Sequence, residues 1–166
     1  MEPLVELEKG LASEDVAVRL QAAERAAQLG SEAQPLAVAL VRACGDADEE
    51  VRNWVTGALE ELGPPRGADL QPLSHLLADS NEEVSYWAAT LLGRLKKDAA
   101  PAVPDLTHVL EHSSSLAVRQ RAAWALGRIG AAARAAMPAL KEASTSNNPR
   151  LARLAAEALT AIEKDH

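Results

Sequence analysis

Aromatic residues are scarce in this chain, which contains no phenylalanine, one tyrosine and three tryptophans, together 2% of its 166 residues. A core without large aromatic rings must be filled by Ala, Leu, Val and Ile, and small or straight-chain residues of this kind favour closely packed helices. The 48% apolar content argues against a disordered chain. We expect one folded domain over residues 1–166, because this length is typical of a single domain.

Cysteine and long apolar runs are also scarce. Cys44 is the only cysteine, so the chain cannot form an internal disulfide, and a reducing compartment is expected. No apolar run approaches the ~18 residues needed to span a bilayer, and we expect no membrane partner. The first residues, MEPLVELEKG, carry acidic side chains where a secretion signal has basic ones. These absences predict a cytoplasmic protein.

Positive charge is in deficit overall, and the net charge of -7 argues against a general nucleic-acid or membrane-surface binder. The deficit is uneven along the chain. Residues 1–83 hold 17 acidic and 6 basic side chains, a net charge of -11. Residues 84–166 hold 7 acidic and 11 basic side chains, a net charge of +4. Association of the acidic end of one copy with the basic end of another would make a homo-oligomer.

Signatures of catalysis and metal binding are missing as well. His108 and His112 share a helix face at i, i+4 spacing, but a metal site needs further ligands. The sequence has no glycine-rich phosphate loop and no dinucleotide-binding fingerprint. Cys44 has no evident histidine partner, and we interpret it as a small packing residue. We therefore expect no catalytic residue, no metal and no cofactor.

A repeat of about 33 residues is the main feature that the sequence does contain. Five similar segments begin at Val18, Val51, Val84, Val118 and Leu151, spaced 33, 33, 34 and 33 residues apart. The extra residue falls in the polar stretch 112–115, where a turn can absorb it. The repeats occupy approximately 1–30, 31–63, 64–97, 98–130 and 131–163.

Each of these segments predicts an amphipathic helix, because apolar residues fall at positions 0, +4, +8 and +11 from its first residue. A shorter apolar stretch before each one predicts a first helix in every repeat. Residues suited to cap a helix N-terminus stand three positions before the first residue of each segment. These caps are Asp15, Asp48, Asn81, Ser115 and Asn148. Three glycines, Gly30, Gly63 and Gly130, should end second helices, and Pro35, Pro101 and Pro138 should open first helices.

The segment VRQRAAWALGRIG, preceded by the proline-rich start PAVPDL and a polar turn, resembles a HEAT repeat of the short bacterial kind found in phycobilisome lyases. The resemblance implies an all-α, right-handed α-solenoid (an armadillo-like α–α superhelix) of five helix–turn–helix repeats. First helices would line its convex side and second helices its concave side. Proteins with such repeats include scaffolds, lyase subunits, DNA-binding modules and hydroxylases. The repeated His-Glu pairs of the HEAT-type hydroxylases are absent from this sequence.

Stacking of the repeats makes two further predictions. A single helix pair cannot bury its apolar stripe alone, so small residues at position +5 should be buried between neighbouring second helices. Arginines at position +1 should reach acidic turn residues of an adjacent repeat, such as Asp46 and Asp79. The +5 residues are Ala23, Thr56, Ala89, Ala123 and Ala156, and the +1 arginines are Arg19, Arg52 and Arg119.

All four aromatic residues lie on second helices, away from the main apolar stripe. With nearby arginines they predict a patch on the concave side that binds a protein or peptide partner. Packing of Trp54 and Trp87 between repeats is the alternative. Gly57, Gly93 and Gly127 would either admit a ligand chain or make room for a tryptophan of the next repeat. The candidate binding residues are Trp54, Tyr86, Trp87, Arg94, Arg121, Trp124 and Arg128.

The resulting functional hypothesis is a non-catalytic scaffold for protein–protein interaction. Two alternatives stay open at this point. The resemblance implies a lyase-associated subunit, although no residue demands that role. The basic second half could contact nucleic-acid phosphates, but the acidic first half argues against this alternative. The arginines that would do so are Arg94, Arg121, Arg128, Arg134, Arg150 and Arg153.

Overall fold

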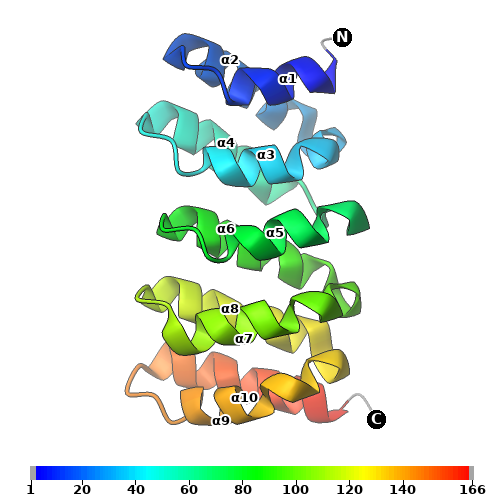
Figure 1. Cartoon of the computed structure of the whole chain (residues 1–166), viewed down its shortest axis with the longest axis vertical. Helices are drawn as coiled ribbons and strands as arrows, with labels where there is room; N and C mark the ends of the chain where they lie inside the picture. Colours follow the sequence, from blue (N-terminus) through cyan, green and yellow to red (C-terminus); the bar gives the residue numbers. More distant parts are fainter. Residues whose placement is uncertain (1–2, 165–166) are drawn as a thin grey trace. The chain divides into compact units, whose positions relative to one another are not determined.

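The computed structural model describes residues 3–164, and all regular secondary structure in that range is helical (Figure 1). The helices follow one another as five pairs, each with a first helix and a longer second helix. This confirms the predicted all-α class. The first helices are α1 (Leu4–Leu11), α3 (Ala37–Ala43), α5 (Leu70–Leu76), α7 (Val103–His112) and α9 (Met137–Ala143). The second helices are α2 (Val16–Leu29), α4 (Glu49–Glu61), α6 (Glu82–Arg94), α8 (Leu116–Ile129) and α10 (Pro149–Lys164).

The chain divides into two compact units, Met1–Asp69 with α1–α4 and Leu70–His166 with α5–α10. Within the first unit α2 packs along α4, and within the second unit α8 packs between α6 and α10. In both units the second helices make more extensive contacts with one another than the first helices do. Side chains that determine how second helices approach each other therefore have the largest effect on the stacking. That the two units form one domain stays a prediction.

The predicted burial of small residues between second helices is confirmed at three of the five +5 positions. Ala23, Ala89 and Ala123 are completely buried, but Thr56 is half-buried and Ala156 is exposed. The prediction was wrong for Ala156 because α10 is the last second helix of the described chain, and no described helix follows to cover it.

The predicted N-caps are confirmed in all five repeats. Each cap side chain accepts a hydrogen bond from a backbone N–H in the first turn of its second helix, which satisfies a donor that the helix itself leaves unpaired. The pairs are Asp15 with Ala17 (2.9 Å), Asp48 with Val51 (3.0 Å), Asn81 with Glu83 (3.0 Å), Ser115 with Val118 (3.3 Å) and Asn148 with Leu151 (2.9 Å).

In the first four repeats, the residue at position +12, where the second helix ends, has a left-handed backbone conformation. Gly30, Gly63 and Gly130 have φ values of 56°, 75° and 76°, which confirms their predicted role. In the third repeat the same position is occupied by Lys96, with φ 53°. A residue with a side chain is strained in this conformation, so Lys96 costs the third repeat free energy of folding that glycine spares the first, second and fourth repeats.

The prolines differ from expectation. Pro138 lies in the first turn of α9, as predicted, but Pro35 and Pro101 lie inside 3-10 segments that precede α3 and α7. These segments span Gly30–Leu36 and Lys96–Ala102. A proline lacks the N–H that an α-helix interior needs, and a short 3-10 turn accommodates it before the α-helix begins.

The predicted arginine contacts between repeats form at Arg19. Its guanidinium donates to both carboxylate oxygens of Asp46, at 2.7 and 3.2 Å. Burial alone would raise the pKa of the Asp46 carboxyl, but hydrogen bonds from Arg19 and the Asp48 backbone, together with the Arg19 and Arg52 charges, hold this pKa below its ordinary value. Arg52 instead donates to the backbone carbonyls of Asp46 and Ala47, just before its own helix. Arg119 donates to the carbonyl of Leu110 in α7, the first helix of the same repeat.

Candidate partner-binding site

The seven predicted binding residues fall into two groups. Trp54 lies on α4 of the first unit and is 41% exposed. On the same helix, nothing lies within 4 Å of where a Cβ on Gly57 would stand. The other six residues lie on α6 and α8 of the second unit: Tyr86, Trp87, Arg94, Arg121, Trp124 and Arg128.

Trp87 is the residue whose position disagrees with a direct binding role. It is only 7% exposed, because α6 is buried along most of its length. Its indole meets the ring of Tyr86 edge-on, with centroids 5.9 Å apart, and the Arg94 guanidinium carbon lies 5.8 Å from the indole centroid. Trp87 therefore supports Tyr86 from within the core, and packing is the interpretation that the structure favours.

Arg121 is stacked between two aromatic rings. Its guanidinium carbon lies 4.7 Å from the ring centroid of Tyr86 and 4.7 Å from that of Trp124, and one of its Nη atoms donates a hydrogen bond to the Tyr86 hydroxyl. Arg128 approaches the same indole at 6.0 Å. Cation–π contacts contribute about 0.5–1 kcal/mol each at exposed sites. The stack of Tyr86, Arg121 and Trp124 is thus held in place before any partner arrives.

The absence of a side chain at Gly93 leaves room for the Trp124 indole. A Cβ at this position would overlap the six-membered ring of the indole, with Cε3 at 3.0 Å and Cη2 at 3.1 Å. This confirms, at Gly93, the alternative in which glycine makes room for a tryptophan of the next repeat. At Gly127 the close neighbour is instead Ala158, whose Cα would lie 3.0 Å from a Cβ. Glycine there lets α8 and α10 approach closely.

Two depressions flank the Trp124 indole. One, of about 210 Å³, has Arg121 and Arg150 as its only charged lining residues. The other, of about 420 Å³, has Lys96, Arg128 and Glu157 as its charged lining residues. Sequence reasoning did not place Lys96 or Arg150 in this patch. The remaining lining residues are Tyr86, Ala117, Gln120 and Leu154 on the first side, and Ala123, Gly127, Leu154, Ala158 and Ala161 on the second.

Residues 3–164 contain no group of three or more His, Cys, Asp or Glu side chains placed to hold a metal ion. None of the helices in this range is long and apolar enough to cross a membrane. What the patch around Trp124 presents is planar rings, guanidinium groups and two shallow depressions.

Comparison with known proteins agrees with this architecture. Similar solved structures include an engineered protein from the Northeast Structural Genomics Consortium (TM-score 0.66, 24% identity, covering 98% of this chain and 80% of that one). The complex of CpcE and CpcF of phycocyanin lyase from Nostoc sp. PCC7120 is similar at TM-score 0.66 and 24% identity, over 99% of this chain and 66% of that one. A designed armadillo repeat protein in complex with the peptide (KR)4 matches at TM-score 0.50 and 20% identity, over 97% and 100%.

These structural likenesses confirm the α-solenoid fold. No curated protein matches the chain. A family model described as HEAT repeats matches residues 70–160, which is more than half of the sequence. The caps, the paired helices and this match lead to one conclusion: the chain belongs to the HEAT repeat family.

Proposed function

We propose that the second unit is a non-catalytic binding module that takes an acidic peptide segment of a protein partner across Trp124. The observation that carries this proposal is the Arg121 guanidinium held between Tyr86 and Trp124. The rings fix the plane of the guanidinium, and only one of its five N–H donors is known to be used, in the bond to Tyr86. The others can meet a carboxylate, with which a guanidinium forms strong paired hydrogen bonds.

Charge supports the same class of partner. Around the indole, Lys96, Arg121, Arg128 and Arg150 face a single acid, Glu157. A basic patch of this kind attracts carboxylates and disfavours basic segments. The designed neighbour is solved with the basic peptide (KR)4, so the expected charge preference here is the reverse of that complex.

The smaller of the two depressions favours peptide side chains, whereas the larger one, at about 420 Å³, is within the size range of small-molecule sites. The pocket beside Arg121 measures about 210 Å³, below the ~300–1,000 Å³ of a typical small-molecule site. It suits one or two side chains. A chain crossing Trp124 would place side chains in both depressions, and aromatic and arginine anchors of this kind dominate binding energy at interfaces.

The test uses a fluorescein-labelled peptide of alternating Glu and Leu as the probe and fluorescence anisotropy as the readout. Trp124→Ala should weaken binding about thirtyfold, which corresponds to roughly 2 kcal/mol for a lost aromatic anchor. Leu116→Ala is the matched control, since Leu116 is an exposed apolar residue on the same helix. Binding should also weaken as salt is raised.

Three outcomes would contradict the proposal: equal binding by wild type and Trp124→Ala, an equal loss in Leu116→Ala, or preference for a Lys-Leu peptide. Trp54→Ala extends the test to the first unit. A loss of affinity there adds Trp54 to the site, whereas unchanged affinity confines the site to the second unit.

The two alternatives keep their own tests. A lyase-associated role rests on a fold likeness, and co-purification of a coloured tetrapyrrole would favour it. Nucleic-acid binding would need Arg134 and Arg153 in addition to the patch, and a steep loss of affinity for an oligonucleotide with rising salt would favour it.

A specific observation also favours association between copies. The first anchor, Val18, is 41% exposed, whereas the anchors of the other four repeats are at most 3% exposed. We propose that the basic end of a second copy covers Val18, because residues 1–83 are acidic and residues 84–166 basic. Sedimentation should then show larger species at low salt that Val18→Lys abolishes; a single monomeric species for wild type at all concentrations would contradict this. The four buried anchors are Val51, Val84, Val118 and Leu151.

A further inference from the structure

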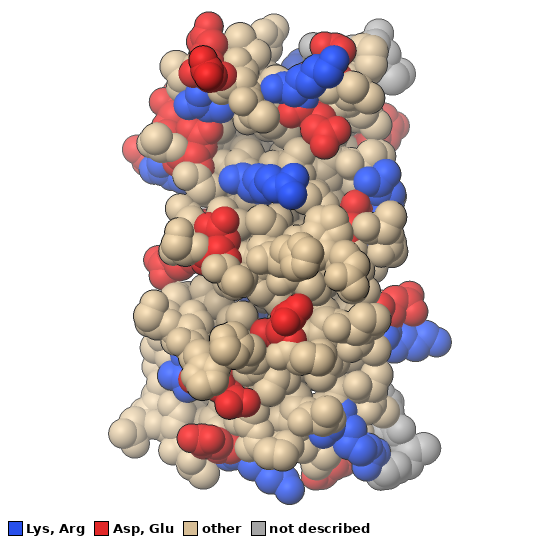
Figure 2. All heavy atoms as spheres, viewed as in Figure 1, with Lys and Arg blue, Asp and Glu red and all other residues tan. Residues whose placement is uncertain are grey.

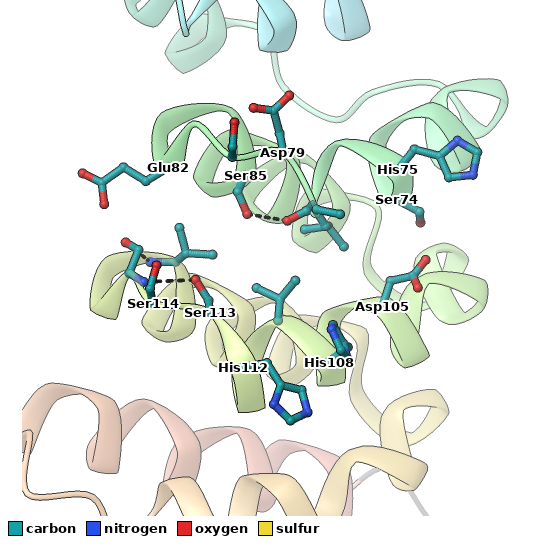
Figure 3. Close-up of a pocket in the computed structure, with 16 residues that line it drawn as sticks. Ser74, His75, Asp79, Glu82, Ser85, Asp105, His108, His112, Ser113 and Ser114 are labelled. Carbon is teal, nitrogen blue, oxygen red and sulfur yellow. Dashed lines mark hydrogen bonds between the residues drawn. The ribbon is translucent and has the colours of Figure 1, made fainter.

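A cavity of the second unit lies on the opposite, first-helix side, between α5 and α7. It measures about 650 Å³, within the range of small-molecule sites. Figure 2 shows that uncharged atoms cover most of this side of α5 and α7. Figure 3 shows the cavity walls: α5 and the turn after it on one side, and α7 with the serine-rich turn after it on the other.

A departure from the repeat accounts for the cavity. The spacing from Val84 to Val118 is 34 residues, whereas the other repeats are spaced by 33. Here α7 has 10 residues, against 7 in α5 and α9, and the turn 113–115 follows it. Within this unit α7 packs more extensively on α9 than on α5. Insertions in repeat proteins tend to gather on a binding face, and this one borders a cavity.

The floor of the cavity is apolar and its walls are polar. Leu77, Val109 and Val118 are buried, with exposures of 3%, 7% and 1%. Ser74 is only 5% exposed, and its hydroxyl has no hydrogen-bond partner among the described residues. By contrast, the Ser85 hydroxyl donates to the Leu77 carbonyl at 2.7 Å. A buried hydroxyl without a partner is uncommon, and Ser74 lines this cavity.

The ionisable side chains that line the cavity are carboxylates and histidines. The lining includes three carboxylates and no Lys or Arg. Figure 3 shows the Ser74 hydroxyl on the side of α5 that faces α7, and the Asp105 carboxylate on the facing wall. In the same view Asp79 points away from the gap. No ion pair to Asp105 is recorded within residues 3–164. Asp105 and Ser74 therefore form a polar end above an apolar floor.

We propose that this cavity binds an organic cation, namely an ammonium or guanidinium group on an aliphatic stem. The cationic head would donate hydrogen bonds to the Asp105 carboxylate and the Ser74 hydroxyl, and the stem would lie on Leu77 and Val109. A carboxylate in a lining without Lys or Arg favours a cation, and charge-assisted hydrogen bonds are the stronger ones. The same chemistry can come from a free amine or from an arginine or lysine side chain of a peptide.

The experiment is a ¹H–¹⁵N NMR titration of the full chain with n-pentylamine, a free alkylammonium, and with the capped peptide acetyl-Ala-Arg-Ala-amide. Either cation should shift the backbone amides of Ser74, Leu77 and Val109, the residues that the proposal places against the ligand. Pentanol, which has a similar stem without the charge, should shift them at least tenfold more weakly. The tighter of the two cations identifies the source, free amine or peptide side chain.

Asp105→Asn should raise the dissociation constant at least tenfold. Asp98→Asn is the matched control, because Asp98 is an exposed carboxylate of the same unit outside the cavity lining, and its dissociation constant should equal that of wild type. The amide spectrum itself reports whether each variant is folded. The proposal is overturned if neither cation shifts these amides at millimolar concentration, if pentanol binds as tightly, or if Asp105→Asn binds like wild type.

Discussion

Replacing Gly93 with alanine sets two opposed effects against each other. Away from other side chains, Gly→Ala inside a helix stabilises a protein by about 1 kcal/mol, because alanine restricts the unfolded chain. At Gly93 the new methyl group would overlap the Trp124 ring, with Cε3 at 3.0 Å and Cη2 at 3.1 Å. Ordinary carbon contacts lie at about 3.5–4.0 Å, and overpacking a well-packed site costs roughly 1–3 kcal/mol.

Gly57→Ala is the matched control, since no atom lies within 4 Å of its added Cβ and the helical gain should be realised in full. Gly57→Ala should therefore raise the free energy of unfolding by about 1 kcal/mol. Gly93→Ala should lower it by about 0–2 kcal/mol, the clash less the helical gain. The difference between the two variants, about 1–3 kcal/mol, measures the clash with the indole.

Urea unfolding followed by circular dichroism measures both changes. In a Trp124→Ala background the methyl group has room, and Gly93→Ala should become stabilising by about 1 kcal/mol. If Gly93→Ala stabilises the wild-type chain as much as Gly57→Ala does, the indole does not rest on Gly93 and the preorganised stack is refuted. Displacement of the indole in Gly93→Ala should also weaken binding of the Glu-Leu peptide, although the substitution does not change the charge of the protein.

Two further predictions concern stability alone. Lys96→Gly should raise the free energy of unfolding by about 1 kcal/mol, because it removes a side chain from left-handed backbone; an unchanged urea midpoint would count against it. Asp46→Asn should destabilise the chain above the ordinary carboxyl pKa of 3.8. Because the folded-state pKa of Asp46 is lowered, the difference between wild type and variant should shrink as the pH falls through that lower value. A difference that does not change with pH would show that the carboxylate of Asp46 makes no such contribution.

The features that sequence reasoning predicted correctly are those decided within a few residues. A cap such as Asn148 acts on an amide three residues away, and the same pattern occurs five times, so each instance supports the others. Burial is decided differently. Position +3 holds an exposed tryptophan at Trp54, a buried one at Trp87 and a half-buried arginine at Arg121. The neighbour across the helix contact determines each outcome, and a single repeat does not contain that neighbour.

The two candidate sites differ in whether sequence could have located them. Neighbouring second helices meet at Gly93 (position +9) and Trp124 (position +6 of the next repeat). The sequence therefore allowed the prediction that the glycine makes room for the tryptophan. The extra residue before Ser115 was visible too, but an insertion can be absorbed in a turn or can separate two helices, with the same spacing in both cases. Which occurs depends on how α7 packs between α5 and α9, a tertiary balance. Here α7 packs more on α9 than on α5, and the Ser74 hydroxyl, which lines the cavity between α5 and α7, has no hydrogen-bond partner. A packing change elsewhere in the unit thus creates an unsatisfied polar group, which a ligand can then satisfy.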